Sequence, residues 1–352
     1  MKFGISLVPD SGEEDKSAAD YYREVLRLCR IADEGGLEWV KMTEHYLHAY
    51  GGYSPDPLVF LATVGAQTER VRLMTGGVLP VFHHPVILAS RAAMVDVLTG
   101  GRLDLGFARG YLPYEHDTFG VPMEESHERF EASVNALTRL LTEENVTEKT
   151  PFFAFENATV LPRPTQQPIP LWSAAVRADK SFVRLGEQGH GLLATPMVKP
   201  LETFRDQIAL YRDSFRPATP GATAQVVVSL PIFVAENDKE AVETGDRLLE
   251  HYWKVWADST DSWNGTTSDS FPTYSQMGER LRSLPISAWR EMGSAWFGSP
   301  ERVADQIRAF HEESGGVEGV IAQVDFGSVP LEVAERSLRL FLDEVLPKVA
   351  DL

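Results

Sequence analysis

Short apolar runs and longer amphipathic segments alternate along the chain. The short runs predict strands at residues 2–8, 37–42, 71–79, 102–107, 171–175, 191–194, 225–235 and 317–326. Between them, apolar residues recur at helical spacing, which predicts helices at residues 20–33, 57–68, 85–98, 124–141, 179–187, 201–214, 239–257 and 331–345. Such alternation is typical of a parallel sheet. Because eight strands alternate with helices, we predict an α/β fold, a closed (β/α)8 TIM barrel.

One segment departs from this pattern. Residues 258–297 are rich in Ser, Thr and Trp and only partly helical in pattern, so we interpret them as an insertion before the eighth strand. The helix that follows begins at Ser299 and Pro300, where Ser is a preferred N-cap and Pro a preferred first residue. No linker divides the chain, so we predict one domain, residues 1–352.

Polar residues directly follow the second predicted strand. Glu44, His45 and Tyr46 come just past its end, which is where a parallel barrel keeps its chemistry. An imidazole in that position can act as an acid or a base near neutral pH. His45 is therefore a candidate catalytic residue, with a structural histidine as the alternative.

A second candidate site would bind an anion. Arg109 follows the fourth predicted strand, where a guanidinium can bind a phosphate through two hydrogen bonds; pairing with Glu115 or Asp117 is the alternative. The turn at residues 173–181 has small residues, open backbone N–H groups and the Ser181 hydroxyl at the start of a helix. An ordinary strand–helix turn is the alternative there.

Large apolar side chains gather near the predicted strand ends. They are Tyr46, Tyr50, Tyr53, Phe82, Phe107, Tyr111, Trp172 and Met197. Their number around one rim predicts an apolar pocket for a planar or hydrophobic ligand.

Composition and missing motifs narrow the classes of function. The net charge of -18 argues against nucleic acid or an anionic membrane as partner, and no apolar run is long enough to span a bilayer. The one cysteine, Cys29, excludes an internal disulfide and favours a cytoplasmic protein. We find no phosphate-binding nucleotide loop, dinucleotide fingerprint, hydrolase nucleophile elbow or zinc motif, and therefore expect no metal.

Five motifs occur in a characteristic order. They are A-D-E-G-G-L-E-W-V-K-M-T-E-H-Y (32–46), T-G-G-V-L-P (75–80), L-T-G-G-R-L-D-L-G-F-A-R-G (98–110), F-G-S-P-E-R-V (297–303) and S-L-R-L-F-L-D-E-V-L-P (337–347). With the opening M-K-F-G-I-S-L, the chain resembles the bacterial luciferase-like family of flavin-dependent oxidoreductases nearly from end to end.

The resemblance implies a (β/α)8 barrel that binds reduced FMN or, in some branches, a deazaflavin. His45 matches the catalytic histidine of the family, and Arg109 would bind the flavin phosphate. Further flavin contacts would come from Thr75 and Gly76, near an unusual cis peptide, and from Ala175, Val176, Arg177 and Ser181. The substrate pocket would include Glu44, Tyr46, Tyr53, Phe107, Tyr111, Trp172 and Met197.

The implied function is an FMN-dependent monooxygenase. Reduced flavin and O2 would form a C4a-peroxyflavin that oxygenates a small organic substrate. The chain has no NAD(P)H motif, so a separate NAD(P)H:flavin reductase is expected, and the family implies a homodimer. Luciferase has a second histidine where this chain has Tyr46 and a reactive cysteine where it has Ala108, so light emission is not expected. A deazaflavin-dependent oxidoreductase and a non-catalytic subunit stay as alternatives.

Overall fold

Eight parallel strands close into a barrel in the computed structural model, which describes residues 1–197, 199–272 and 274–352. The strands are β1 Lys2–Leu7, β2 Trp39–Met42, β3 Arg72–Thr75, β4 Leu103–Phe107, β7 Leu171–Ala174, β8 Gly191–Ala194, β9 Val226–Val234 and β11 Gly319–Gln323. They pair in that order, and β11 pairs in parallel with β1. This closure confirms the predicted TIM barrel.

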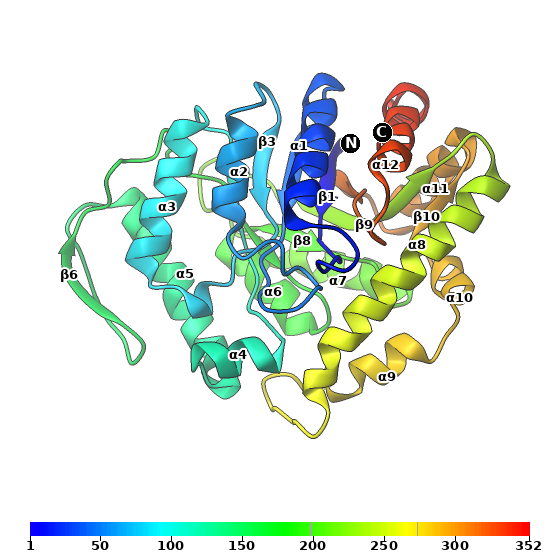
Figure 1. The fold of residues 1–352 in the computed structure, drawn as a ribbon. Helices are drawn as coiled ribbons and strands as arrows, with labels where there is room; N and C mark the ends of the chain where they lie inside the picture. The colour runs from blue at the N-terminus through cyan, green and yellow to red at the C-terminus, as the bar shows by residue number, and fades with distance from the viewer. Residues whose placement is uncertain (198, 273) are drawn as a thin grey trace.

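Helices surround the barrel (Figure 1). They are α1 Ala18–Glu34, α2 Pro57–Gly65, α3 Pro85–Leu98, α5 Ser126–Thr142, α6 Asp179–Gln188, α7 Leu201–Ser214, α8 Asp238–Ser259, α11 Pro300–Glu313 and α12 Leu331–Leu340. Several begin at a side-chain cap: Ser299, for example, accepts the backbone N–H of Arg302, and Pro300 follows it as predicted. Among the helices of the described chain, none is long and apolar enough to cross a membrane.

Two elements differ from the predictions. The third strand ends at Thr75 rather than at residue 79, and Val78 rejoins the sheet through an isolated bridge to Phe107. A cis peptide bond joins Gly76 and Gly77, one bond beyond the expected position. Helix α4, Pro113–Phe119, was not predicted; its seven residues begin with a proline, after the five residues 108–112 that follow β4.

The insertion before the eighth strand is mostly helical. It contains the short helices η3 Thr260–Trp263, η4 Tyr274–Gln276, α9 Met277–Arg282 and α10 Ile286–Glu291, and ends in strand β10 Trp296–Gly298, which pairs with β9. The segment lies beside α8 (Figure 1). A hairpin of β5 Val146–Lys149 and β6 Ala154–Ala158 projects from the opposite side of the molecule (Figure 1).

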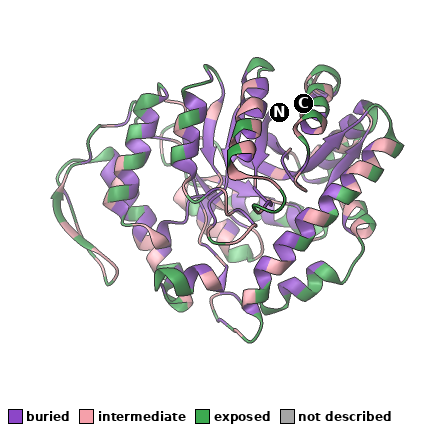
Figure 2. Cartoon of the chain, in the orientation of Figure 1, coloured by how far each residue is buried: buried purple, intermediate pink, exposed green. Residues whose placement is uncertain are grey.

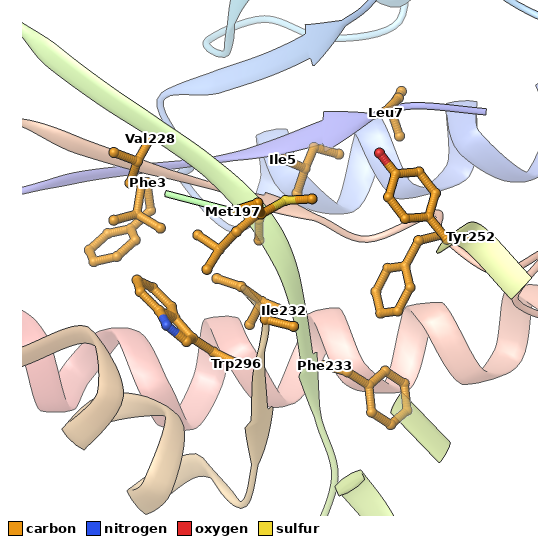
Figure 3. Packing of buried hydrophobic residues seen from close by; sticks show 14 of the residues in the cluster. Phe3, Ile5, Leu7, Met197, Val228, Ile232, Phe233, Tyr252 and Trp296 are labelled. Carbon is orange, nitrogen blue, oxygen red and sulfur yellow. The ribbon is translucent and has the colours of Figure 1, made fainter. Parts of the chain in front are cut away.

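Burial follows the layers of the barrel, along the strands and the inner faces of the helices (Figure 2). The largest apolar cluster includes Phe3 and Ile5 of β1, Val228 and Ile232 of β9, and Trp296 of β10 (Figure 3). A separate cluster brings together Trp39, Met74, Trp172, Leu193, Val227 and Ile321 from six barrel strands. The barrel is therefore packed at one end, which leaves the carboxyl end of its strands for a ligand.

Candidate active site

A cavity of about 230 Å³ opens at the carboxyl end of the barrel. Its wall takes residues from all eight barrel strands or the segments directly after them, from α8, and from Tyr274 and Met277. Chain segments far apart in sequence therefore meet here, as expected for the active end of a parallel barrel.

His45 lies in the cavity wall and is held from behind by Glu115. Its Nδ1 is 3.1 Å from Glu115 Oε1, which also accepts the backbone N–H of Tyr46 at 2.9 Å. Because a carboxylate only accepts, this contact requires a proton on Nδ1, so in the neutral imidazole Nε2 is the acceptor. The ring of Tyr50 lies 5.0 Å from the imidazole, and Gly51 packs so closely that a Cβ there would approach His45 Cβ to 2.5 Å.

Glu44 is buried in the same wall, and both of its carboxylate oxygens have hydrogen-bond partners. Its Oε1 accepts the hydroxyl of Tyr46 at 2.5 Å and lies 2.8 Å from His83 Nε2, while Oε2 accepts the N–H of Leu79. Burial, together with the Glu44 charge, raises the pKa of Tyr46 far above its usual value. Tyr46 is thus a neutral donor behind Glu44, with its ring against Phe82, and it does not line the cavity.

Gly76 and Gly77 line the cavity with backbone alone, because neither residue has a side chain; we call this part the bare wall. A Cβ on Gly77 would lie 2.4 Å from the carbonyl carbon of Phe107, and one on Gly76 would lie 2.4 Å from Lys41 Cγ. Thr75 lies outside the wall, where its hydroxyl bonds both the N–H and the carbonyl of Gly106 at 2.8 Å. Backbone without side chains lets a planar group approach closely.

Arg109 lies beside the cavity rather than in its wall, where the charges of both Arg184 and Glu124 act on it. Arg109 Nη2 donates to the carbonyl of Ser270 at 2.9 Å, and its guanidinium lies 4.0 Å from the ring of Phe271. Burial and then the neighbouring cations Arg184, Arg109 and Lys180 lower the pKa of His127. Arg109 has no ion pair with any described residue, so the alternative pairing with Glu115 is not seen.

The turn before α6 only partly reaches the cavity. Val176 lies in the wall, whereas Ala175 is buried behind it. The guanidinium of Arg177 lies 5.5 Å from the ring of the wall residue Tyr274 and lines an adjoining cleft. The N–H of Ser181 donates to the carbonyl of Ala178 inside the first turn of α6.

Some of the residues predicted for the substrate pocket line this cavity, and others lie elsewhere. Tyr111 and Met197 line the cavity; Tyr53, Phe107 and Trp172 do not. Tyr53 packs against α1 and donates to the carbonyl of Lys16. Phe107 points out of the barrel because its neighbour Gly106 faces in, and Trp172 lies one layer deeper than the wall residue Ala174.

Several wall residues were missed. Tyr252 and Trp256 come from α8, and the indole N–H of Trp256 donates to the Tyr111 hydroxyl at 2.8 Å. Lys41 lies within the buried strand β2, and a lysine inside a run of apolar residues was a signal in the sequence. Glu115 gave no such signal, because its partner His45 is 70 residues away.

Comparison with known proteins gives consistent matches. The family described as luciferase-like monooxygenase matches residues 1–317. The oxygenase component of the flavin-dependent trigonelline monooxygenase of Acinetobacter baylyi is 25% identical, over 100% of this chain and 96% of that protein. The F420-dependent glucose-6-phosphate dehydrogenase of Kribbella flavida is 30% identical, over 96% of this chain and 98% of that protein.

A solved structure extends the likeness to three dimensions. The crystal structure of monooxygenase RslO1 from Streptomyces bottropensis matches with a TM-score of 0.84 at 36% sequence identity. The match covers 99% of this chain and 99% of that one. The similarity therefore includes the barrel, the insertion and the strand ends that carry the cavity.

Proposed function

Because the chain belongs to the luciferase-like monooxygenase family, we propose that it is the oxygenating component of an FMN-dependent monooxygenase. It would take reduced FMN from a separate NAD(P)H:flavin reductase and use O2 to oxygenate a small organic substrate. The observation that carries this proposal is the convergence of three features on one cavity: an oriented histidine, a wall of bare backbone and a group of cations beside it.

The residues present fit FMN. The Gly76–Gly77 backbone offers a flat surface for a ring system, since side chains at either position would collide with their neighbours. Arg109 forms no ion pair with a described carboxylate, although Glu124 acts on its charge from a distance, and Arg184 lies near it, so a phosphate could take the place of the missing ion-pair partner. We infer that Arg109 holds the phosphate and that Gly76 and Val176 contact the rest of the flavin.

The protein's own part would be to position groups, exclude water and move a proton. Reduced FMN, when bound, supplies the electrons that activate O2. Tyr50, Tyr111 and Trp256 make the cavity apolar, which protects a reactive species from water. His45 presents Nε2 while Glu115 fixes Nδ1–H, so the imidazole can accept or return a proton at one defined atom.

A deazaflavin-dependent oxidoreductase is the second candidate. The chain is 30% identical to a dehydrogenase named for coenzyme F420, which is a deazaflavin, and this similarity favours the second candidate over an unrelated activity. Anaerobic titration with reduced FMN and, separately, with reduced deazaflavin would distinguish the two, with quenching of protein fluorescence as the signal. The proposal predicts tighter binding of reduced FMN. Preference for the deazaflavin would replace it with the second candidate, and binding of neither would reject both.

We also propose a homodimer formed through α2 and α3. Large apolar side chains are exposed on these two helices, including Val59, Ile87, Met94 and Leu98. The three on α3 are spaced by seven and four residues, which places them on one face. A contiguous exposed apolar face of this kind marks a protein interface.

A further inference from the structure

A buried lysine faces the cavity from within the barrel. Lys41 lies on β2, two residues after the inward-facing Trp39, and so points into the barrel. Its stem passes beneath Gly76, where a Cβ would come within 2.4 Å of Lys41 Cγ. The residue is 8% exposed, and its side chain forms part of the cavity wall.

No described residue neutralises or accepts from this ammonium group. Lys41 Nζ donates no hydrogen bond and forms no ion pair in the described parts of the chain. Asp325 is the carboxyl group that acts on it electrostatically, but that side chain is held by the N–H of Val8 at 3.1 Å and the hydroxyl of Tyr21 at 2.8 Å. A structural lysine in a protein interior normally has a partner.

Two more polar groups without partners lie next to Lys41. Strand β1 lies between β2 and β11. Ser6 of β1 is paired with Lys41 of β2 on one side and with Gln323 of β11 on the other. Ser6 Oγ and Gln323 Nε2 are both buried and meet no partner at hydrogen-bond geometry among the described residues, although the Gln323 amide lies close enough to Tyr252 to act on its hydroxyl. The ammonium of Lys41, the amide N–H groups of Gln323 and the Ser6 hydroxyl are donors, and the Gln323 amide oxygen and the Ser6 hydroxyl are the acceptors, so donors outnumber acceptors.

We propose that Lys41, with Gln323 beside it in the cavity wall, binds an acidic oxygen of the substrate: a carboxylate, phenolate or enolate. This inference rests on the proposed function, and it narrows the substrate to an apolar, ring-sized molecule that carries such a group. An anion would offset the burial of the ammonium and satisfy the donors at once. The aromatic wall above, including Tyr50 and Trp256, would enclose the rest of the molecule.

The test uses benzoate as the anionic probe and benzamide as its neutral counterpart, with binding measured by calorimetry. The wild type should bind benzoate about tenfold more tightly than benzamide, because a charged hydrogen bond contributes roughly 1.5 kcal/mol or more. Lys41→Met keeps an unbranched side chain that is one atom shorter, and it removes the charge. It should lower benzoate affinity about tenfold and leave benzamide affinity within about threefold.

Controls separate this inference from the proposed function. Lys239→Met, an exposed substitution on α8, should bind benzoate like the wild type. Gln323→Leu should also weaken benzoate binding, and it decides the matter should Lys41→Met fail to fold. Equal binding of the two probes by the wild type, no benzoate binding, or unchanged benzoate affinity in the folded variants would overturn the inference. Failure of the proposed function would show instead as a loss of flavin binding, which none of these assays measures.

Discussion

Glu115 gives the His45 imidazole one orientation, and the contact depends on a single oxygen. Oε1 serves both His45 Nδ1 and the N–H of Tyr46, while Oε2 has no partner among the described residues. The carboxylate is fully buried, so its hydrogen bonds are strong and cannot be replaced by solvent. Glu115 is therefore a positioning residue that acts through His45.

We predict that in Glu115→Gln the His45 imidazole is no longer restricted to one tautomer. An amide can donate as well as accept, so Nδ1 need no longer carry the proton. Histidine nitrogen-15 NMR should show one tautomer in the wild type and a mixture in the variant. Glu332→Gln, on the exposed face of α12, is the matched control. A His45 spectrum unchanged by Glu115→Gln would show that another group fixes the ring.

Lys41→Met should stabilise the protein near neutral pH. Burial lowers the pKa of Lys41 from 10.5 to about 8. Below pH 8 the Lys41 ammonium stays charged in the folded state. Burying this charge on folding costs roughly 3 kcal/mol of stability. The unfolded chain binds more protons between pH 8 and 10.5, so wild-type stability rises there relative to the variant. Urea denaturation at pH 7 to 10 measures this; a constant difference would contradict it.

At the scale of elements, the βα units adjoining α6 hold a histidine in its neutral form. His190 follows the left-handed Gly189 that ends α6, and its Nδ1 lies 3.0 Å from the hydroxyl of Ser173 on β7. Burial, then the charge of Arg184, lowers the pKa of His190 to about 4. Protonation of this residue is therefore linked to unfolding.

Replacing His190 should reduce the amount of stability that the protein loses as the pH falls. Because the folded pKa lies below the unfolded value, the stability is fully present above about pH 6.5 and is lost as the pH falls toward 4, by roughly 3 kcal/mol. We expect His190→Gln to show a smaller decrease than the wild type when both are unfolded with urea at pH 7, 5.5 and 4. Parallel decreases would contradict the assignment. Comparing the two proteins cancels the contributions of other acid-titrating groups.

The segment after β3 needs glycine for contact with β4. Gly77→Ala would place a methyl group 2.4 Å from the Phe107 carbonyl carbon, so the backbone must move. We predict a loss of roughly 1–3 kcal/mol in stability and weaker binding of reduced FMN. In contrast, Gly12→Ala meets no atom closer than 3.9 Å and should change neither. Thermal unfolding and flavin titration measure the two effects. If Gly77→Ala had wild-type stability and flavin affinity, glycine would not be needed at this position of the cavity wall.

At the scale of the whole molecule, the proposed homodimer depends on the exposed apolar face of α3. One chain has a mass of 39.1 kDa, so light scattering after gel filtration distinguishes monomer from dimer. We predict a dimer for the wild type and a monomer for Ile87→Glu, because a charge cannot be buried in an apolar interface without a partner. Leu161→Glu changes a still more exposed apolar residue elsewhere and should stay dimeric. A monomeric wild type would reject the interface.

The barrel was predictable because each strand and helix has its own local pattern. Eight strands followed from apolar runs, and the start of α11 followed from Ser299 and Pro300. The site was less predictable, since strand ends identified His45 but not its partner Glu115 on the short, unpredicted α4. Phe107 and Trp172 were assigned to the pocket by position alone, whereas strand alternation and layer depth decide which side chains reach it.

A crystal structure of the protein soaked with FMN tests the central claim most directly. The account predicts the phosphate at Arg109 and the ring system in the cavity against Gly76 and Gly77, with His45 in the same cavity. A phosphate bound away from Arg109, or a ring system outside the cavity, would contradict it.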